Sequence, residues 1–309
     1  MGRVHVAGSV NMDVSVRVER RPEPGETVAG EDLDFGLGGK GANQAVAAAR
    51  LGADVGMVGR VGDDEFGAEL LDRLDREPLS LDRVRRVADA STGTALITVD
   101  ADSENAIVVV PGANGTLSPA DVRPVAFDPG DVAVSQFEVP QPAVRAFFEA
   151  ARDAGATTVL NPAPAAEFRE SIPGLVDYLV VNETEAAFYG GGRGSGTRER
   201  TAEADLLDAC ERVRAHDEQT VVVTLGAEGV LASGPEETVR LDGHDVDPVD
   251  TTGAGDAFVG ALAAALEDGR DLRDALAFAN AAGAVATTAA GAAPSLPTRA
   301  EVRAFLSNR

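Results

Sequence analysis

The segment 36-GLGGKGANQAVAAARLGADVGMVGRVG-62 contains a glycine-rich turn, a helical pattern and an apolar strand in direct succession. The alanine-rich residues 42–52 predict a helix, and the apolar residues 53–62 predict a buried strand. Similar short apolar runs recur at 4–10, 131–137, 157–163, 178–182, 220–226 and 229–233. Further helical patterns lie at 142–155 and across the alanine-rich segment 254–290. Strands separated by helices of this size predict a mostly parallel α/β sheet with helices on both faces.

Two segments interrupt this alternation. Residues 12–35 are rich in Val, Glu and Pro, and 91-STGTALITVDADSENAIVVV-110 predicts a hairpin around the polar turn 100–105. Strands that flank a site without joining the main sheet are candidates for a lid. We therefore expect one domain over 1–309, with a β-lid formed by about 12–35 and 91–112. The segment 190-GGGRGSGTRER-200 predicts a solvated loop.

The composition limits the classes of partner. There are 27 basic residues against 51 acidic ones, so the formal net charge is −24 at pH 7. The acidic residues are spread along the chain, which predicts an anionic surface that attracts neither nucleic acid nor an anionic membrane. This composition is typical of proteins in concentrated salt, and also of GC-rich genomes. The single Cys210 forms no internal disulfide and no apolar run approaches roughly 20 residues, so we expect a cytoplasmic protein.

Lys40 is the only lysine in the chain, and it stands between glycines. Gly36, Gly38 and Gly41 match G-x-G-x-x-G, but the dinucleotide fingerprint also needs a preceding strand and an acidic residue about 20 positions later. Neither is clear here. A Walker loop is excluded because Gly41 follows the lysine where that motif requires Ser or Thr. The remaining interpretation is a turn at a helix N-terminus, whose amides receive hydroxyl or phosphate oxygens.

The segment 250-DTTGAGDAFVGAL-262 predicts a second helix N-terminus that binds an anion, because several backbone N–H groups point to one place. Asp256 lies in the first turn of this helix, where complementing the helix dipole is one explanation. A carboxylate beside a phosphoryl group repels that ligand unless it has a chemical task. Accepting the proton of an attacking hydroxyl is such a task.

Together, 38-GGKGANQAVAAARLGA-53 and 250-DTTGAGDAFVGAL-262 resemble the two signatures of the ribokinase-like (phosphofructokinase-B type) carbohydrate kinase family. Further matching stretches are 8-GSVNMD-13, 24-PGETV-28, 91-STG-93, 160-LNPAP-164, 182-NETE-185, 224-TLGAEG-229 and 291-GAAPSLP-297. The resemblance covers essentially the whole chain and is closest to the ribokinase branch. It implies the ribokinase-like three-layer fold with a small β-sheet lid, and transfer of the ATP γ-phosphoryl group to a sugar hydroxyl, with D-ribose 5-phosphate as the expected product.

The resemblance also implies the site residues. The sugar-binding residues are Asn11, Asp13, Gly39, Lys40, Gly41, Ala42, Asn43, Glu138 and Asp256. The ATP-binding residues are Asn182, Thr224, Leu225, Gly226, Ala227, Glu228, Gly229, Gly255, Asp256 and Asn280. The catalytic residues are Asp256 and the anion-binding residues Gly253, Ala254 and Gly255.

Two cations are implied by the same resemblance. Asn182 and Glu185 resemble a site for phosphate and hydrated Mg²⁺, and a carboxylate with water ligands suits magnesium. The potassium site of the family corresponds to Asp250, Thr252, Ala286, Ala289, Gly291 and Ser295. We therefore expect Mg²⁺ with ATP, and K⁺ as an activator.

The two signatures do not determine the acceptor or the oligomeric state. Kinases of this family for fructose, 2-keto-3-deoxygluconate, ribose 1-phosphate or a nucleoside share both signatures, and a sugar-binding regulator without catalysis is a remote alternative. Val14, Val16 and Val18 alternate with polar residues, whereas 106-AIVVV-110 is apolar on both faces. A strand that is apolar on both faces needs a second cover, so we expect a homodimer formed lid to lid.

Overall fold

The computed structural model describes residues 2–101, 105–169, 171–191 and 203–307. Most of the predicted loop 190–200, and residues 102–104 of the predicted turn, lie outside this range. A large sheet is formed by β1 (Val4–Ala7), β4 (Val55–Gly62), β5 (Ser80–Val87), β8 (Val132–Gln136), β9 (Thr157–Asn161), β10 (Tyr178–Asn182), β11 (Thr220–Thr224), β12 (Val230–Ser233) and β13 (Thr238–Leu241). A small sheet is formed by β2 (Asn11–Val18), β3 (Gly30–Gly38), β6 (Gly93–Val99) and β7 (Asn105–Val110).

The helices connect and cover these strands. The α-helices are α1 (Lys40–Arg50), α2 (Glu65–Leu74), α3 (Pro119–Val122), α4 (Gln141–Asp153), α5 (Glu183–Tyr189), α6 (Glu203–Val213), α7 (Ala254–Glu267), α8 (Leu272–Ala286), α9 (Ala292–Ser295) and α10 (Arg299–Ser307). Short 3-10 helices are η1 (Gly112–Thr116), η2 (Pro173–Leu175) and η3 (Gly226–Glu228).

The large sheet is mostly parallel, with the strand order β13-β12-β11-β10-β9-β8-β1-β4-β5. Strand β1 pairs in parallel with β4 on one side and with β8 on the other. Among the described strands of this sheet, only the pairs β11 with β12 and β12 with β13 are antiparallel. The chain first adds strands on the β4 side of β1 and then on the β8 side, so the strand order reverses at β1. Ligands of open α/β sheets bind beyond the carboxyl ends of the strands at such a point.

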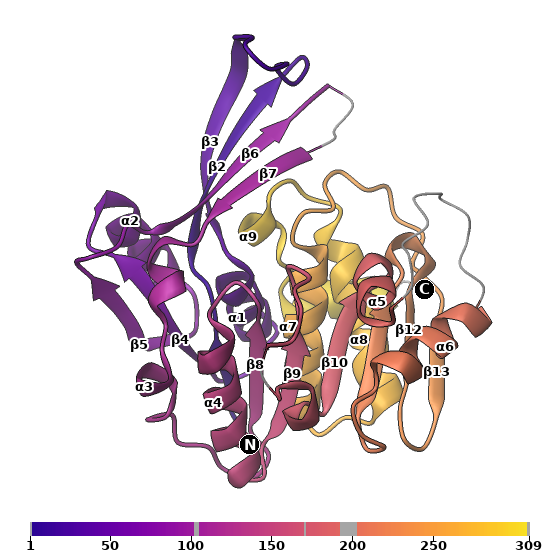
Figure 1. Cartoon of the computed structure of the whole chain (residues 1–309). Coiled ribbons are helices and arrows are strands. Elements are labelled where there is room, and N and C mark those ends of the chain that lie inside the picture. The colour runs from indigo at the N-terminus through magenta and orange to yellow at the C-terminus, as the bar shows by residue number, and fades with distance from the viewer. Residues whose placement is uncertain (1, 102–104, 170, 192–202, 308–309) are drawn as a thin grey trace.

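Two hydrophobic layers hold helices on the two faces of this sheet, because alternate strand residues face opposite sides. Val4, Val6 and Val134 pack in one core with α1, α7 and α8. Ala7 and Ala133 belong to the other core, which contains residues of α4 and α6. The resulting helix–sheet–helix arrangement is visible in Figure 1. The predicted fold class is therefore confirmed.

The small sheet projects from this layered body (Figure 1). Its strand order is β3-β2-β6-β7, in which β2 and β3 are antiparallel, β2 and β6 parallel, and β6 and β7 antiparallel. The predicted hairpin is thus present as β6 and β7, and β2 and β3 lie within the other predicted segment and the residues next to it. Asn11 at the start of β2 is paired with Gly38 of β3 and Gly93 of β6. The ends of these strands therefore meet directly beside the body.

The sequence patterns gave one wrong helix prediction and missed several helices and strands. The segment 254–290 is not one helical stretch but the two helices α7 and α8, separated by a turn in which Gly269 has a φ of 74°. Strands β5 and β13 were not predicted. Both lie at the edges of the sheet, and β5 (SLDRVRRV) carries charged residues that an edge strand tolerates. The helices α2, α6 and α10 were also missed.

Candidate active site

Polar residues converge where five neighbouring parallel strands end. Ser9 follows β1, Glu138 follows β8, and Asn161, Asn182 and Thr224 are the last residues of β9, β10 and β11. These strands are adjacent in the sheet, so their carboxyl ends form one continuous edge. Two of the five, Ser9 and Asn161, were not among the predicted site residues.

The glycine-rich turn is tied to this edge by hydrogen bonds. The backbone N–H of Lys40 donates to Glu138 Oε2 over 3.0 Å, and Ser9 Oγ donates to the same oxygen over 2.5 Å. Ser9 Oγ in turn accepts the backbone N–H of Gly41 over 3.2 Å. These bonds connect the start of α1 with the loops after β1 and β8. Gly41, Ala42 and Asn43 are buried in the first turn of α1. Lys40, which follows Gly39 and begins this helix, is partly buried.

The ammonium group of Lys40 lies among carboxylates. The negative charge of Asp256 raises the pKa of Lys40 despite the opposing effect of burial, and Glu138 and Glu185 act in the same direction as Asp256. Lys40 therefore stays protonated. The isolated lysine is thus a fixed positive charge in the middle of the predicted site.

Asp13 faces the same group of charges from the small sheet. Its partner strand carries Gly38, where an added Cβ would lie 2.1 Å from both carboxylate oxygens of Asp13. Any larger residue at position 38 would displace this carboxylate. Burial, with the charges of Glu138 and Asp256, raises the pKa of Asp13 from 3.8 to about 7. Asp13 is thus both buried and close to like charges.

Asp256 is held in the first turn of α7 and is 7% exposed. Asn43 Nδ2 donates to Asp256 Oδ2 over 3.0 Å, and Gln44 Nε2 donates to Asp256 Oδ1 over 3.0 Å. Gly253 precedes the helix with a φ of 80°, a left-handed conformation that favours glycine. The N–H groups at positions 253–255 and the Asp256 carboxylate thus lie at one helix N-terminus, beside α1. Ala254 and Gly255 are the first two residues of this helix.

Asn182 and Glu185 form a capping box at the start of α5. Asn182 Oδ1 accepts the N–H of Glu185 over 2.8 Å, and Glu185 Oε2 accepts the N–H of Asn182 over 2.9 Å. Burial raises the pKa of Glu185, the bond from Asn182 and the charge of Lys40 lower it, and Asp256 raises it further. Glu185 is therefore within electrostatic reach of Lys40 and Asp256.

The loop before α7 meets the segment after α8. Asp250 accepts the N–H of Thr252 and the N–H of Gly291, each over 2.9 Å. Burial by itself raises the pKa of Asp250, but these hydrogen bonds outweigh it and the pKa is lowered. Thr252 and Gly291 are thus brought together around a carboxylate. The other three residues of the predicted potassium site belong to the same segment of the chain as Gly291. Ala286 is at the end of α8, Ala289 is in the turn after it, and Ser295 is at the end of α9.

The predicted nucleotide residues gather around the segment 241–243. An added Cβ on Gly229 would lie 2.2 Å from Leu241 O, so the loop 224–229 runs against this segment. Asn280 Nδ2 donates to Asp242 O over 2.9 Å. The loop and α8 therefore approach the same short stretch from two sides. Within the loop, Leu225 is buried, Thr224 is partly buried, and Ala227 and Glu228 are exposed.

Several polar residues of the site were missed by the sequence analysis. Ser9, Gln44, Asn114, Gln136 and Asn161 are buried and hydrogen-bonded to predicted residues or to one another. Asn114, in η1, accepts the N–H of Val10 over 2.9 Å and donates to Asn11 Oδ1 over 2.7 Å. Ser9, Gln44 and Asn161 lie within stretches that match the family, and this position was the available signal in the sequence. Their burial then requires polar partners.

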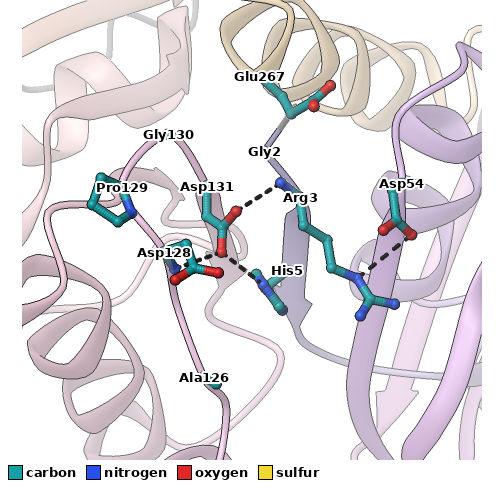
Figure 2. Close-up of a pocket in the computed structure, with 10 residues that line it drawn as sticks. All are labelled: Gly2, Arg3, His5, Asp54, Ala126, Asp128, Pro129, Gly130, Asp131 and Glu267. Carbon is teal, nitrogen blue, oxygen red and sulfur yellow. Dashed lines mark hydrogen bonds and ion pairs between the residues drawn. The ribbon is translucent and has the colours of Figure 1, made fainter.

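A separate hollow of about 560 Å³ lies at the opposite, amino-terminal end of β1, where Figure 2 shows His5 and Arg3 among several acidic residues. Asp131 accepts the N–H of Arg3 over 2.7 Å and is paired with His5 Nε2 at 3.2 Å. Burial lowers the pKa of His5 against the opposing effect of Asp131. Arg3 and His5 are thus paired with acidic residues of the hollow, and none of the residues that line it was predicted as a site residue.

Two features are absent from the part of the chain that the structure describes. No three His, Cys, Asp or Glu side chains there are arranged to hold a metal ion together. No helix in that part has the length and apolar character needed to cross a membrane.

The chain matches the pfkB family carbohydrate kinase over residues 1–299. It belongs to this family. The ribokinase of Bacillus subtilis (strain 168) is 38% identical to the chain, over 99% of this chain and 100% of its own length. The family signatures and the carbohydrate kinase class inferred from the sequence are therefore confirmed.

Solved structures of the family agree over the whole length. The crystal structure of ribokinase from Thermotoga maritima is 32% identical and has a TM-score of 0.88, covering 100% of both chains. The structure of Arabidopsis thaliana ribokinase, solved with ribose and ATP, is 30% identical with a TM-score of 0.85, covering 99% of this chain and 98% of its own. The helix–sheet–helix body and the projecting sheet are thus family features.

Proposed function

We propose that this pfkB family kinase transfers the γ-phosphoryl group of ATP to D-ribose and forms ribose 5-phosphate. The observation that carries the proposal is the buried Asp256 at the N-terminus of α7, within electrostatic reach of Lys40 and Asp13. The full-length similarity to ribokinases supports ribose as the acceptor.

In this mechanism Asp256 accepts the proton of the attacking sugar hydroxyl. The N–H groups of residues 253–255 and the ammonium group of Lys40 stabilise the negative charge on the transferred group. Asn43 donates to Asp256 and so holds the carboxylate in place. The chain therefore supplies a base and fixed positive charge at one point, which is what in-line transfer requires.

The sugar would bind between the small sheet and the body. Asn11 and Asp13 reach it from β2, Glu138 from the end of β8, and residues 39–43 from the start of α1. Asp13, Glu138 and Asp256 are all carboxylates, and they favour a neutral acceptor over a phosphorylated one. This arrangement argues against ribose 1-phosphate as the substrate.

The nucleotide would bind along the loop 224–229, with Asn280 near its base and Asn182 near its phosphates. Mg²⁺ fits at Glu185, because one carboxylate together with phosphate oxygens and water is a donor set that magnesium accepts. When bound, Mg²⁺ neutralises charge on the phosphates. Glu185 is 9% exposed, so its carboxylate is largely shielded from bulk water.

K⁺ would bind beside the anion-binding helix, at the loop of Asp250 and Thr252 and the segment 286–295. Asp250 brings the negative charge, and its lowered pKa keeps it ionised. Backbone carbonyls and the Ser295 hydroxyl would complete a site of oxygen donors. K⁺ is thus proposed as an activator that does not touch the sugar.

The small sheet would close over the sugar and exclude water, which otherwise competes as acceptor. It leaves large apolar side chains exposed: Leu33 is 55% exposed, Ile107 50% and Val108 62%. Phe35 and Leu96 add to this surface. We propose that a second subunit covers it in a lid-to-lid homodimer. The acidic composition further supports an enzyme of a salty cytoplasm.

A turnover assay with an acceptor panel tests the function. Purified protein in high salt is given Mg-ATP with D-ribose, fructose, 2-keto-3-deoxygluconate, ribose 1-phosphate or a nucleoside, and ADP release is measured. We expect the highest kcat/KM for D-ribose, with ribose 5-phosphate identified by ³¹P NMR. A higher kcat/KM for another acceptor overturns the choice of ribose, and no turnover with any of them overturns the kinase proposal.

A further inference from the structure

Three buried amide side chains from elements far apart in the sequence form a hydrogen-bonded row, and the middle one also bonds to Asp256. Gln44 comes from α1, Gln136 is the last residue of β8, and Asn161 is the last residue of β9. Gln44 and Gln136 are fully buried, and Asn161 is 9% exposed. None of the three was assigned a role above, although Gln44 belongs to 38-GGKGANQAVAAARLGA-53 and Asn161 to 160-LNPAP-164.

The direction of every hydrogen bond in this row is set by one backbone carbonyl. Asn161 Nδ2 donates to Val180 O of β10 over 2.9 Å, so Asn161 Oδ1 faces Gln44. Because that oxygen only accepts, Gln44 presents its Nε2, which donates to Asn161 Oδ1 over 3.2 Å and to Asp256 Oδ1 over 3.0 Å. Gln44 Oε1 then accepts Gln136 Nε2 over 3.1 Å.

This row leaves acceptors unused in the protein interior. Gln136 Oε1 and Asn43 Oδ1 are buried without a hydrogen-bond partner in the part of the chain that the structure describes. Both belong to amides whose other end serves Asp256, Asn43 directly and Gln136 through Gln44. An unsatisfied buried acceptor destabilises the fold, so replacing the whole row by apolar residues of similar shape would be neutral or stabilising, although replacing one member alone leaves its partners unpaired. The amides are therefore present although they lower the stability of the fold.

The row is not needed to pack α1 against α7. An added Cβ on Gly260 of α7 would lie 2.5 Å from the Cβ of Ala47 and 2.7 Å from Gln44 O, so the two helices are in direct contact. Small buried residues on both helices make this contact. The distinctive result of the row is the donor that it presents to Asp256.

We propose that Asn161 and Gln44 are positioning residues for the Asp256 carboxylate, anchored on the Val180 carbonyl of the central sheet. Gln44 holds Oδ1 and Asn43 holds Oδ2, so rotation of the carboxylate is restrained before the substrate binds. This role rests on the proposed function, in which Asp256 accepts the proton of the sugar hydroxyl. It assigns a task to the asparagine of 160-LNPAP-164.

The first test compares Gln44→Leu and Asn161→Leu with Gln219→Leu. Gln219 is a matched control, because it is fully buried and donates to Pro173 O and Val176 O over 3.0 and 2.8 Å. It directly precedes β11, at the end of that strand opposite to the site. We expect Gln44→Leu to lower kcat about 10- to 100-fold, with both KM values within about 3-fold of wild type. Asn161→Leu should act in the same direction. Gln219→Leu should lower the Tm and leave kcat unchanged.

If Gln44→Leu and Asn161→Leu lower only the Tm, as Gln219→Leu does, the row is structural and the proposal is overturned. An equal rise in the KM for sugar and for ATP, with kcat unchanged, also overturns it. Should Gln44→Leu fail to fold, Asn161→Leu decides the question, because it removes the anchor without touching Asp256.

A second test does not depend on the acceptor. The Tm of Gln44→Leu, Asp256→Ala and the double variant is compared with wild type, and Asn161→Leu replaces Gln44→Leu in a parallel cycle. We expect the Tm losses not to add, since the two side chains share one hydrogen bond. Additive losses overturn the positioning role even if the enzyme phosphorylates ribose. Coupled losses in a protein that does not turn over ribose overturn only the proposed acceptor.

Discussion

Asp13→Asn should stabilise the fold and weaken sugar binding at the same time. Burial, with the charges of Glu138 and Asp256, raises the pKa of Asp13 from 3.8 to about 7. A tenfold change in an ionisation constant corresponds to about 1.4 kcal/mol, so ionising Asp13 costs the folded chain about 4 kcal/mol more than the unfolded chain. Asparagine has a similar shape and carries no charge, and it removes this penalty.

The sign of the pH dependence follows from the direction of this change. The folded-state pKa is above the unfolded-state value of 3.8, so the penalty is absent below about pH 3.8 and complete above about pH 7. We expect Asp13→Asn to raise the free energy of unfolding by about 4 kcal/mol at pH 8.5 and by only about 2 kcal/mol at pH 5.5. Urea unfolding of both proteins in the same salt measures the difference.

Asp89→Asn is the matched control, because Asp89 is exposed and the substitution removes the same formal charge. Its effect should stay within about 0.5 kcal/mol at both pH values. The KM of Asp13→Asn for the sugar should rise about 10- to 100-fold, since a charge-assisted hydrogen bond is lost. A variant that gains equal stability at pH 5.5 and 8.5, or that loses stability, would refute the raised pKa of Asp13, which burial and the carboxylates of Glu138 and Asp256 cause.

The other expectations concern catalysis and assembly. Asp256→Asn should lower kcat by roughly 10²–10⁴ with substrate affinities within a few-fold, and an unchanged kcat would remove its role as base. Lys40→Arg keeps the charge but replaces a compact ammonium by a broad planar group among carboxylates, so kcat should fall; equal activity would make the single lysine incidental. Light scattering in high salt should report a dimer for the wild type and for the control Leu306→Asp, and a monomer when Val108 and Val110 are both replaced by Asp. A wild-type monomer at micromolar concentration contradicts the proposed interface, as does a dimer that survives both replacements.

The layered fold was predictable because its strands are buried on both faces. Short runs such as LVV of β10 and VVV of β11 are apolar without interruption, which is the pattern of a covered parallel strand. The edge strand β5 was missed for the same physical reason, because its exposed side permits Arg and Asp. Burial, rather than β-propensity, thus decided which strands the sequence revealed.

The charged groups of the site were predictable as well, whereas their amide partners were not. Asp256 and Lys40 stand out because a charge among glycines needs an explanation. Gln44, in contrast, reads as one more polar residue of a helix, and its partner Asn161 lies 117 residues away. Which amide faces which carboxylate depends on how α1 meets the end of β9, and no spacing along the sequence carries that information.

The charges of the site also determine how the nucleotide binds. Asp13, Glu138, Glu185 and Asp256 are four carboxylates against the single ammonium of Lys40, which leaves a formal charge of −3 when all are ionised. Phosphates that entered alone would be repelled, so we expect the nucleotide to bind together with a divalent cation.

Glu185→Gln separates repulsion by Glu185 from metal binding by the same residue. Glutamine keeps the capping box with Asn182, because Gln serves at this position as Glu does. With Mg²⁺ present the variant should bind ATP more weakly than wild type, since the metal loses a carboxylate. With EDTA the order should reverse, because one negative charge beside the phosphates is gone. Calorimetric titration in both conditions checks this reversal. If metal-free ATP binds Glu185→Gln no better than wild type, Glu185 does not face the phosphates, and the charge argument for joint binding of metal and nucleotide fails.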